Sequence, residues 1–335
     1  SNVGQTSNKG IELSLTGYII ETNDFSLNAT FNIGHNKNKI DKLSSGENEW
    51  ILSSGWAGTQ LLNTDDYRAR VGGTSGLIYG FVNDGFYTMN DFESFDSTAR
   101  TWKLKDGVVD SSPLSGTPRP GNAKFKKLTP VDENSANPYQ ITDDDRTVIG
   151  ETTPKFSGGF GLNATYKGFD LSMFFNFMYG FDVYNANKIM MTTWYDNSGN
   201  NLSMDVASDK RWRNFDDMGN EIRYNPEALA KFNENATMWN PTSIGRPIAM
   251  SYAIEDGSFL RLNTLTLGYT LPQAWTRKAG LNKVRFYMSG YNLWTITGYS
   301  GYDPEVNIAT GLTPNIDHDA YPRSRTYTFG VQLTF

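Results

Sequence analysis

Strict alternation of apolar and polar residues recurs along this chain. The clearest case is TYTFGVQLTF at residues 326–335, where Tyr327, Phe329 and Val331 alternate with small or polar residues. Such alternation is typical of a β-strand with one face in an apolar medium and the other in a polar medium. The apolar medium is a core in a soluble sandwich and lipid in a membrane barrel, and this stretch alone fits both.

The alternation predicts about nine strands, two pairs of which form hairpins at the tight turns 22–24 and 167–168. The expected strands are 10–20, 25–34, 60–71, 77–88, 156–166, 169–179, 259–271, 284–297 and 324–335.

The connections between these strands are sorted by length. Short ones alternate with long ones along the chain, so all the short ones fall at one end of the strands and all the long ones at the other. The short ones are 22–24, 72–76, 167–168 and 272–283, and the long ones are 42–59, 89–153, 180–256 and 298–323. Outer-membrane barrels have short periplasmic turns and long outer loops, and a soluble sandwich has no reason to sort its loops in this way.

Composition agrees with a barrel. The chain has 335 residues, of which 14% are aromatic and only 38% hydrophobic, and no run approaches a membrane helix in length. Its net charge of −6 argues against nucleic acid as a partner, and the lack of cysteine excludes thiolate chemistry.

We expect the sequence to be a piece of a longer protein. Its opening, SNVGQTSNKG, lacks the features of a secretion signal. About nine strands also cannot complete a bacterial barrel, which has an even number of strands. The fold class predicted is therefore all-β: the C-terminal part of a transmembrane antiparallel β-barrel with long extracellular loops.

Several stretches, in order, resemble one family. The most specific are DGSFLRLNTLTLGYTLP at 256–272 and TGYSGYDPEV at 297–306. Further matches are Asn8-Lys9-Gly10-Ile11-Glu12, Tyr79-Gly80-Phe81, Pro120-Gly121, Asp145-Arg146, Phe169-Asp170-Leu171, Tyr291-Asn292-Leu293 and Tyr321-Pro322. The chain thereby resembles, over essentially its whole length, the C-terminal half of the SusC/RagA-type TonB-dependent outer-membrane transporters of Bacteroidetes.

This resemblance implies active import of large nutrients across the outer membrane of a Gram-negative bacterium, with glycan as the first cargo and oligopeptide as the second. It implies a barrel of about 22 strands, of which residues 1–335 are the C-terminal portion. The plug domain and the N-terminal strands lie outside this sequence. The implied partners are a SusD-like surface lipoprotein that forms a lid, TonB through the missing plug region, the remaining barrel strands and outer-membrane lipid.

One departure concerns calcium. The family often carries a calcium-loop-like Asp-x-Asn-x-Asp-Gly segment, and this chain reads KLTPVDENSANPYQITDDDR there. Asp143, Asp144 and Asp145 form the densest acidic cluster, but consecutive side chains in an extended loop point apart. We therefore expect no metal site and no cofactor.

The candidate substrate-binding residues are Trp194, Tyr195, Trp212 and Trp239, all in the long loop 180–256. Flat rings bury the apolar faces of sugars or peptides while polar neighbours fix the orientation of the ligand. Three alternatives stay open: these rings pack the loop against itself, they form an aromatic girdle at the membrane boundary, or they form the docking surface for the lid.

No catalytic residues are expected, and the chain is not expected to be an enzyme. It has only two histidines, His35 and His318, and no pair of carboxylates is singled out by its spacing. The TGYSGYDPEV turn is assigned a structural role. Two rival functions remain: a soluble all-β carbohydrate-binding or adhesin module, and a passive porin.

The barrel prediction also assigns faces. Phe25, Phe31, Phe175, Phe329 and Phe335 should contact lipid. The residues expected to line a wet lumen are Ser26, Asn28, Thr30, Asn32, Asp170, Asn176, Thr328 and Gln332.

Overall fold

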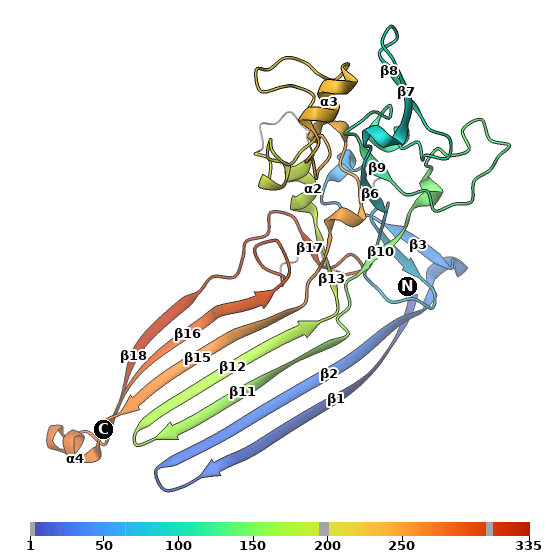
Figure 1. The fold of residues 1–335 in the computed structure, drawn as a ribbon. Helices are drawn as coiled ribbons and strands as arrows, with labels where there is room; N and C mark the ends of the chain where they lie inside the picture. The colour runs from blue at the N-terminus through green and yellow to red at the C-terminus, as the bar shows by residue number, and fades with distance from the viewer. Residues whose placement is uncertain (1–3, 64, 194–200, 306–310) are drawn as a thin grey trace.

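Seven long antiparallel strands form one tilted sheet, which we call the wall (Figure 1). The computed structural model describes residues 4–63, 65–193, 201–305 and 311–335. In sheet order the wall strands are β1 (Gly4–Glu21), β2 (Phe25–Leu43), β11 (Phe156–Tyr166), β12 (Phe169–Tyr179), β15 (Phe259–Thr270), β16 (Lys283–Thr297) and β18 (Thr326–Thr334).

Strand register divides the wall into an apolar outer face and a polar inner face. One row of paired positions runs Phe31, Phe160, Phe175, Leu262 and Trp294 across five strands. Within this row the rings of Phe160 and Phe175 stack with centroids 4.5 Å apart. Rows of this kind fix the register, because a one-residue slip would move every ring to the polar face.

The residues predicted to face lipid and lumen lie on opposite faces of the wall. Phe25, Phe31, Phe175 and Phe329 are on the outer face, and Phe335 follows the last strand. All eight residues predicted to be wet are on the inner face.

The all-β fold class is confirmed, but two of the expected strands are not part of the wall. The regions 60–71 and 77–88 contribute only short strands, β4 (Tyr67–Arg70) and β5 (Leu77–Gly80), to a separate four-stranded sheet. Tyr67 and Ile78 face a buried core and not lipid.

Because these two regions lie outside the wall, fewer connections join the wall strands, and the short and long ones still lie at opposite ends. The connections 22–24, 167–168 and 271–282 lie at one end of the wall, and 44–155, 180–258 and 298–325 lie at the other (Figure 1). The turn 72–76, predicted at the short-turn end, instead lies within the first long segment.

The described parts of the three long segments pack together as a second body, which we call the loop layer. Its four-stranded sheet has the order β10 (Thr147–Glu151), β5, β4 and β3 (Glu49–Leu52). Its other strands are β14 (Ile254–Asp256), β13 (Asp182–Asn185) and β17 (Ile316–Asp317), then β6 (Asn83–Phe86) with β9 (Ala123–Phe125), and β7 (Phe92–Asp96) with β8 (Thr101–Leu104). Its helices are α1 (Ser112–Ser115), α2 (Ala186–Thr192) and α3 (Pro226–Phe232), whereas α4 (Gln273–Thr276) lies in the connection 271–282 at the other end of the wall.

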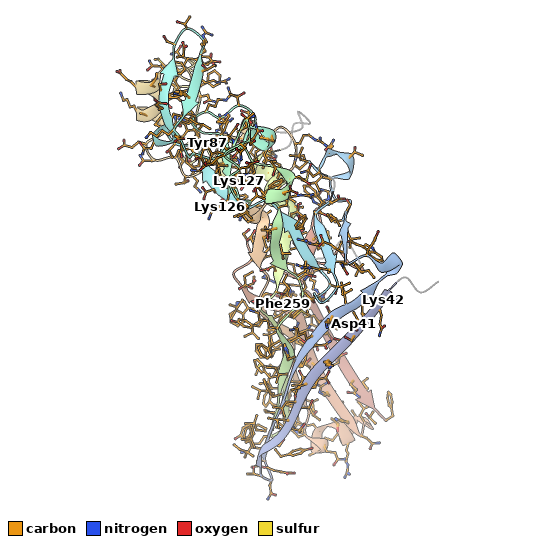
Figure 2. All side chains as sticks on the ribbon, turned by 90° about the vertical axis from the view of Figure 1, so that its right-hand side faces the viewer. Asp41, Lys42, Tyr87, Lys126, Lys127 and Phe259 are labelled. Carbon is orange, nitrogen blue, oxygen red and sulfur yellow. The ribbon has the colours of Figure 1, made fainter. Side chains whose placement is uncertain are left out.

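The loop layer has its own hydrophobic core. Tyr67, Ile78, Phe125, Tyr184 and Trp239 are at most 1% exposed and belong to one buried cluster. Figure 2 shows Phe259 where the wall meets the loop layer, with Tyr87, Lys126 and Lys127 well inside that layer. Among the described residues, no helix combines the length and apolar character needed to cross a membrane.

Candidate functional site

A cleft of about 600 Å³ opens in the loop layer where the second and third long segments meet. We call it the loop cleft. One side comes from α2 and residues 203–205, and the other comes from residues 300–302 and 317–322. Short parallel pairing of β13 with β17 brings these sequence-distant segments together, since Tyr184 pairs with Ile316 and Asn185 with Asp317. The volume is in the range of sites for small ligands.

Glu255 holds one side of the loop cleft in place. Its carboxylate accepts hydrogen bonds from the Ser300 amide at 3.0 Å, the Ser300 hydroxyl at 2.8 Å and the Asn185 amide at 2.9 Å. Lys188 Nζ lies 3.5 Å from the same carboxylate and 4.4 Å from the Tyr252 ring centroid. Burial acts to raise the pKa of Glu255, but the Ser300 bonds and the Lys188 charge outweigh it, and the pKa lies below its ordinary value.

Asp317 fixes the opposite side. It is buried, and its carboxylate accepts hydrogen bonds from Asn187 Nδ2 at 3.0 Å and from the Tyr299 hydroxyl at 2.7 Å. Burial raises the pKa of Asp317 in spite of these bonds. Asn187 Oδ1 also accepts from the Asp319 amide at 2.9 Å, so the polar framework of the loop cleft is pre-formed.

The lining of the loop cleft combines free rings with free polar groups. Tyr302 and Tyr321 are 81% and 89% exposed, the highest exposures of any tyrosines among the exposed large hydrophobic residues. The side chain of Asp319 is 74% exposed, and Asp205 is also exposed. Aromatic faces beside carboxylates and an ammonium group suit a ligand with both apolar faces and hydroxyl or amide groups.

Of the four residues predicted from the sequence, the two that the structure describes do not line this cleft. Trp239 is 1% exposed, and its Nε1 donates to the Thr192 carbonyl at 3.2 Å. Trp212 is 4% exposed and packs on Phe86. Both therefore pack the loop layer against itself, which was one of the open alternatives. Trp194 and Tyr195 lie outside the described residues, and a ligand role for the four stays a prediction.

The sequence analysis missed the residues that line the loop cleft. Tyr302 lies within TGYSGYDPEV, whose assigned structural role accounts for its neighbours: Tyr299 binds Asp317, and Asp303 binds Arg261. The sequence did contain a signal: in two places a tyrosine stands shortly before a proline, at Tyr302-Asp303-Pro304 and at Tyr321-Pro322.

A buried ionic network ties the third long segment to the wall beneath the loop cleft. Arg261 on β15 is 3% exposed and lies 2.6 Å from Asp303 and 3.0 Å from Glu305. Arg323 lies 3.3 Å from the other oxygen of Glu305. The network ties the residues that directly follow Tyr302 to the inner face of the wall.

The inner face continues as a polar surface down to the short-turn end. Side-chain hydrogen bonds join Ser26 to Thr165 at 2.6 Å and Thr266 to Ser289 at 2.8 Å. Near the turns, Arg285 Nε donates to Asp170 at 2.8 Å across Gly268, whose missing side chain leaves room for the guanidinium group. This hydrogen-bonded polar face is what a water-filled lumen requires.

The acidic cluster at 143–145 serves the fold of the loop layer. Asp145 is buried and accepts hydrogen bonds from the Leu128 and Thr129 amides at 2.8 and 2.7 Å. Asp143 pairs with Arg146 at 2.7 Å. Among the described residues, no group of three or more His, Asp or Glu side chains is placed to hold a metal ion.

Comparison with known proteins gives relatives over the full chain, although no family model matches. TonB-dependent receptor P3 of Formosa agariphila is 31% identical over 340 residues, which cover 100% of this chain and 29% of that protein. TonB-dependent receptor SusC of Bacteroides thetaiotaomicron is 23% identical, over 100% of this chain and 27% of that protein. A solved structure of the RagAB peptide transporter matches with a TM-score of 0.66 and 25% identity, over 100% of this chain and 30% of the matched chain.

Fold and relatives together show that the chain resembles outer-membrane proteins named as TonB-dependent receptors, and the expected outer-membrane location is confirmed. Within that class, the chain is homologous over its whole length to part of the SusC/RagA-type TonB-dependent receptors, as its motifs indicated. It spans about three tenths of the length of these relatives.

Proposed function

We propose that this chain is the C-terminal part of the barrel and outer loops of a TonB-dependent importer of large nutrients. The complete protein would take energy from TonB through a plug region outside residues 1–335, and a SusD-like surface lipoprotein would cover the loop layer. Homology to TonB-dependent receptor SusC and to the RagAB peptide transporter supports this assignment. The chain performs gated passage and no bond chemistry.

We propose the loop cleft as a contact site for cargo on its way to the lumen. The observation that carries this proposal is the pair of exposed rings, Tyr302 and Tyr321, beside the fixed polar framework of Asn187 and Lys188. The buried ion network that follows Tyr302 in the sequence joins this region to the inner face of the wall, which supports a path from the cleft toward the polar interior.

Glycan is the first cargo we propose. Each ring has a free face on which the apolar face of a sugar could stack, and the carboxylates of Asp205 and Asp319 would accept bonds from paired hydroxyls. Oligopeptide is the second, since the RagAB structure that this chain resembles is described as a peptide transporter.

The test uses the complete transporter with its lid, purified from native outer membranes. Binding of neutral oligosaccharides and of mixed oligopeptides is measured by calorimetry for the native protein, Tyr302→Ala and Tyr321→Ala. We expect each substitution to weaken oligosaccharide binding about tenfold, or about 1.4 kcal/mol. Phe215→Ala removes a 49% exposed ring elsewhere in the loop layer and is the matched control.

The outcomes separate the proposals. If the tyrosine variants lose the binding of peptides, the cargo of this site is peptide and not glycan. Unchanged binding in both variants would refute the loop cleft as a cargo site. Cargo uptake that persists in cells lacking TonB would favour a passive porin and refute active import.

A further inference from the structure

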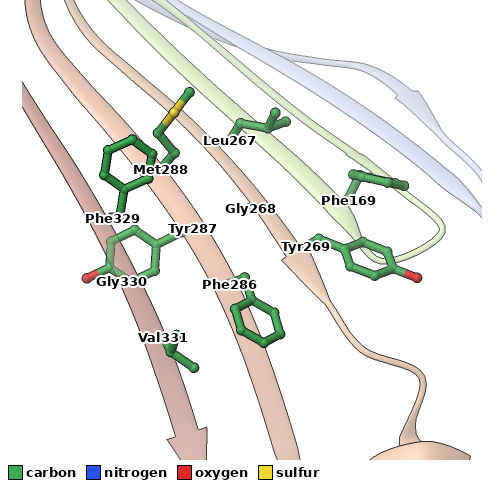
Figure 3. Close-up of a pocket in the computed structure, with 10 residues that line it drawn as sticks. All are labelled: Phe169, Leu267, Gly268, Tyr269, Phe286, Tyr287, Met288, Phe329, Gly330 and Val331. Carbon is green, nitrogen blue, oxygen red and sulfur yellow. The ribbon is translucent and has the colours of Figure 1, made fainter.

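The outer face of the wall contains an apolar groove near its short-turn end. It has a volume of about 510 Å³ and lies across β12, β15, β16 and β18 (Figure 3). Its lining side chains include Phe169, Tyr269, Phe286, Met288, Phe329 and Val331. The rings of Phe169 and Tyr269 pack with centroids 4.4 Å apart, and Figure 3 shows Phe286 and Phe329 on the other side of Gly268.

The side chains that line this groove are solvent-exposed in the chain alone. Phe286 is 47% exposed and Phe329 is 75% exposed. The groove extends across four neighbouring strands, and a gap between aromatic and aliphatic side chains on a lipid-facing surface fits a flexible hydrocarbon chain.

A positively charged turn lies next to the end of the groove. The connection 271–282 joins β15 to β16, the strands that carry Tyr269 and Phe286. It reads LPQAWTRKAGLN and contains Arg277 and Lys278 but no acidic residue. Both cations are exposed, and among the described residues neither has a recorded ion-pair partner. Lys283, which directly follows the turn, is not counted with these two cations because it faces Asp170 on the inner side of the wall.

This turn is well built. The Trp275 amide donates to the Pro272 carbonyl at 2.9 Å, and the Leu281 amide donates to the Thr276 carbonyl at 3.1 Å. Gly280, with a φ of +73°, closes the turn. Trp275 remains 62% exposed, which is costly in water but typical of a tryptophan at a membrane boundary.

We propose that the groove and the turn together form a binding site for one anionic phospholipid of the leaflet at the short-turn end. An acyl chain would lie between Phe286 and Tyr269, and the phosphate headgroup would meet Arg277 and Lys278. Trp275 would lie at the depth of the headgroups. Charge favours this occupant over a zwitterionic lipid, because each cation near an anionic headgroup strengthens binding by about 1 kcal/mol.

The test compares phosphatidylglycerol with phosphatidylethanolamine of identical acyl chains. The complete protein is purified, stripped of lipid in detergent, and titrated with each lipid by native mass spectrometry. We expect tighter binding of phosphatidylglycerol, and a roughly thirtyfold loss in the double variant Arg277→Gln, Lys278→Gln. The double variant Lys9→Gln, Lys37→Gln is the matched control, since these two exposed cations occupy neighbouring positions of β1 and β2 toward the other end of the wall.

Two further measurements separate the headgroup from the groove. Phe286→Ala should weaken the binding of both lipids alike, because it removes a wall of the groove. Phosphatidylglycerol with brominated chains should quench tryptophan fluorescence in the native protein and measurably less in Trp275→Phe. Equal affinity for the two lipids, an equal loss in the control variant, or quenching unchanged in Trp275→Phe would overturn the proposal. Unchanged far-ultraviolet circular dichroism verifies that each variant folds.

Discussion

Removing one carboxylate from the buried ionic network should loosen the third long segment from the wall. The Glu305 backbone amide donates a hydrogen bond to the Asp303 side chain at 2.9 Å. In Asp303→Asn the side-chain oxygen of the new asparagine can still accept this bond. The substitution therefore removes a charge with little change of shape. Arg261, which is 3% exposed, is left with Glu305 as its carboxylate partner, a residue it shares with Arg323.

The magnitude follows from the burial of this pair. Breaking a buried ion pair costs about 3–5 kcal/mol, because the remaining charge stays desolvated. We take the lower end, about 3 kcal/mol, since Glu305 still compensates part of the Arg261 charge. The equilibrium constant for local opening of residues 298–305 should therefore rise roughly a hundredfold.

Hydrogen exchange of peptides covering these residues measures that opening directly. Arg261→Met should cost a similar amount, and the double variant should cost less than the two single costs added, because it leaves Glu305 and Arg323 balanced. Asp217→Asn is the control: Asp217 lies at the same 2.6 Å from Arg213 but is 76% exposed, so about 1 kcal/mol or less is expected. Strictly additive costs, or a change in protection no larger than in the control, would refute the reasoning.

Three further predictions concern other buried contacts. Hydrogen bonds to Asp145 outweigh its burial and hold its pKa at about 2. Its contribution to stability should therefore be complete above pH 4 and lost as the pH falls toward 2. Acid titration of loop-layer unfolding should show this pH window, and Asp145→Ala should abolish it. Burial raises the pKa of Asp66 to about 6, so the loop layer should lose up to about 3 kcal/mol of stability as the pH rises from 4 to 7. Hydrogen exchange at several pH values measures this loss. A dependence of stability on pH that persists in Asp66→Asn would contradict the prediction. Gly268→Val would place Cβ 2.4 Å from the Arg285 guanidinium group and should break its bond to Asp170; a lower thermal midpoint than in Gly17→Val, where the new side chain meets open space, is expected.

Alternation predicted the wall because each wall strand separates two media along its whole length. Residues 25–34, 156–166 and 169–179 largely follow this pattern, and their strands were found within a few residues, although β2 continues to Leu43. The same periodicity failed at 60–71 and 77–88. A short strand that packs on a buried core also alternates, and a pattern of period two does not distinguish the core around Tyr67 and Ile78 from lipid.

The loop cleft could not be predicted for a different reason. Its two sides are about a hundred residues apart in the sequence, and the pairing of β13 with β17 and side-chain bonds such as that of Asn187 to Asp317 bring them together. The tryptophans were chosen because large rings often bind ligands. The loop layer is large enough to need a core of its own, and Trp239 fills that core. Ring type alone does not say whether a side chain packs inside or meets a ligand.

The pairing of β2 with β11 joins residues on either side of the long segment 44–155. Their register depends on ring rows within the wall and not on the length of the chain between them. Insertions, deletions or replacements in that segment can therefore change the outward-facing surface while the barrel frame stays the same.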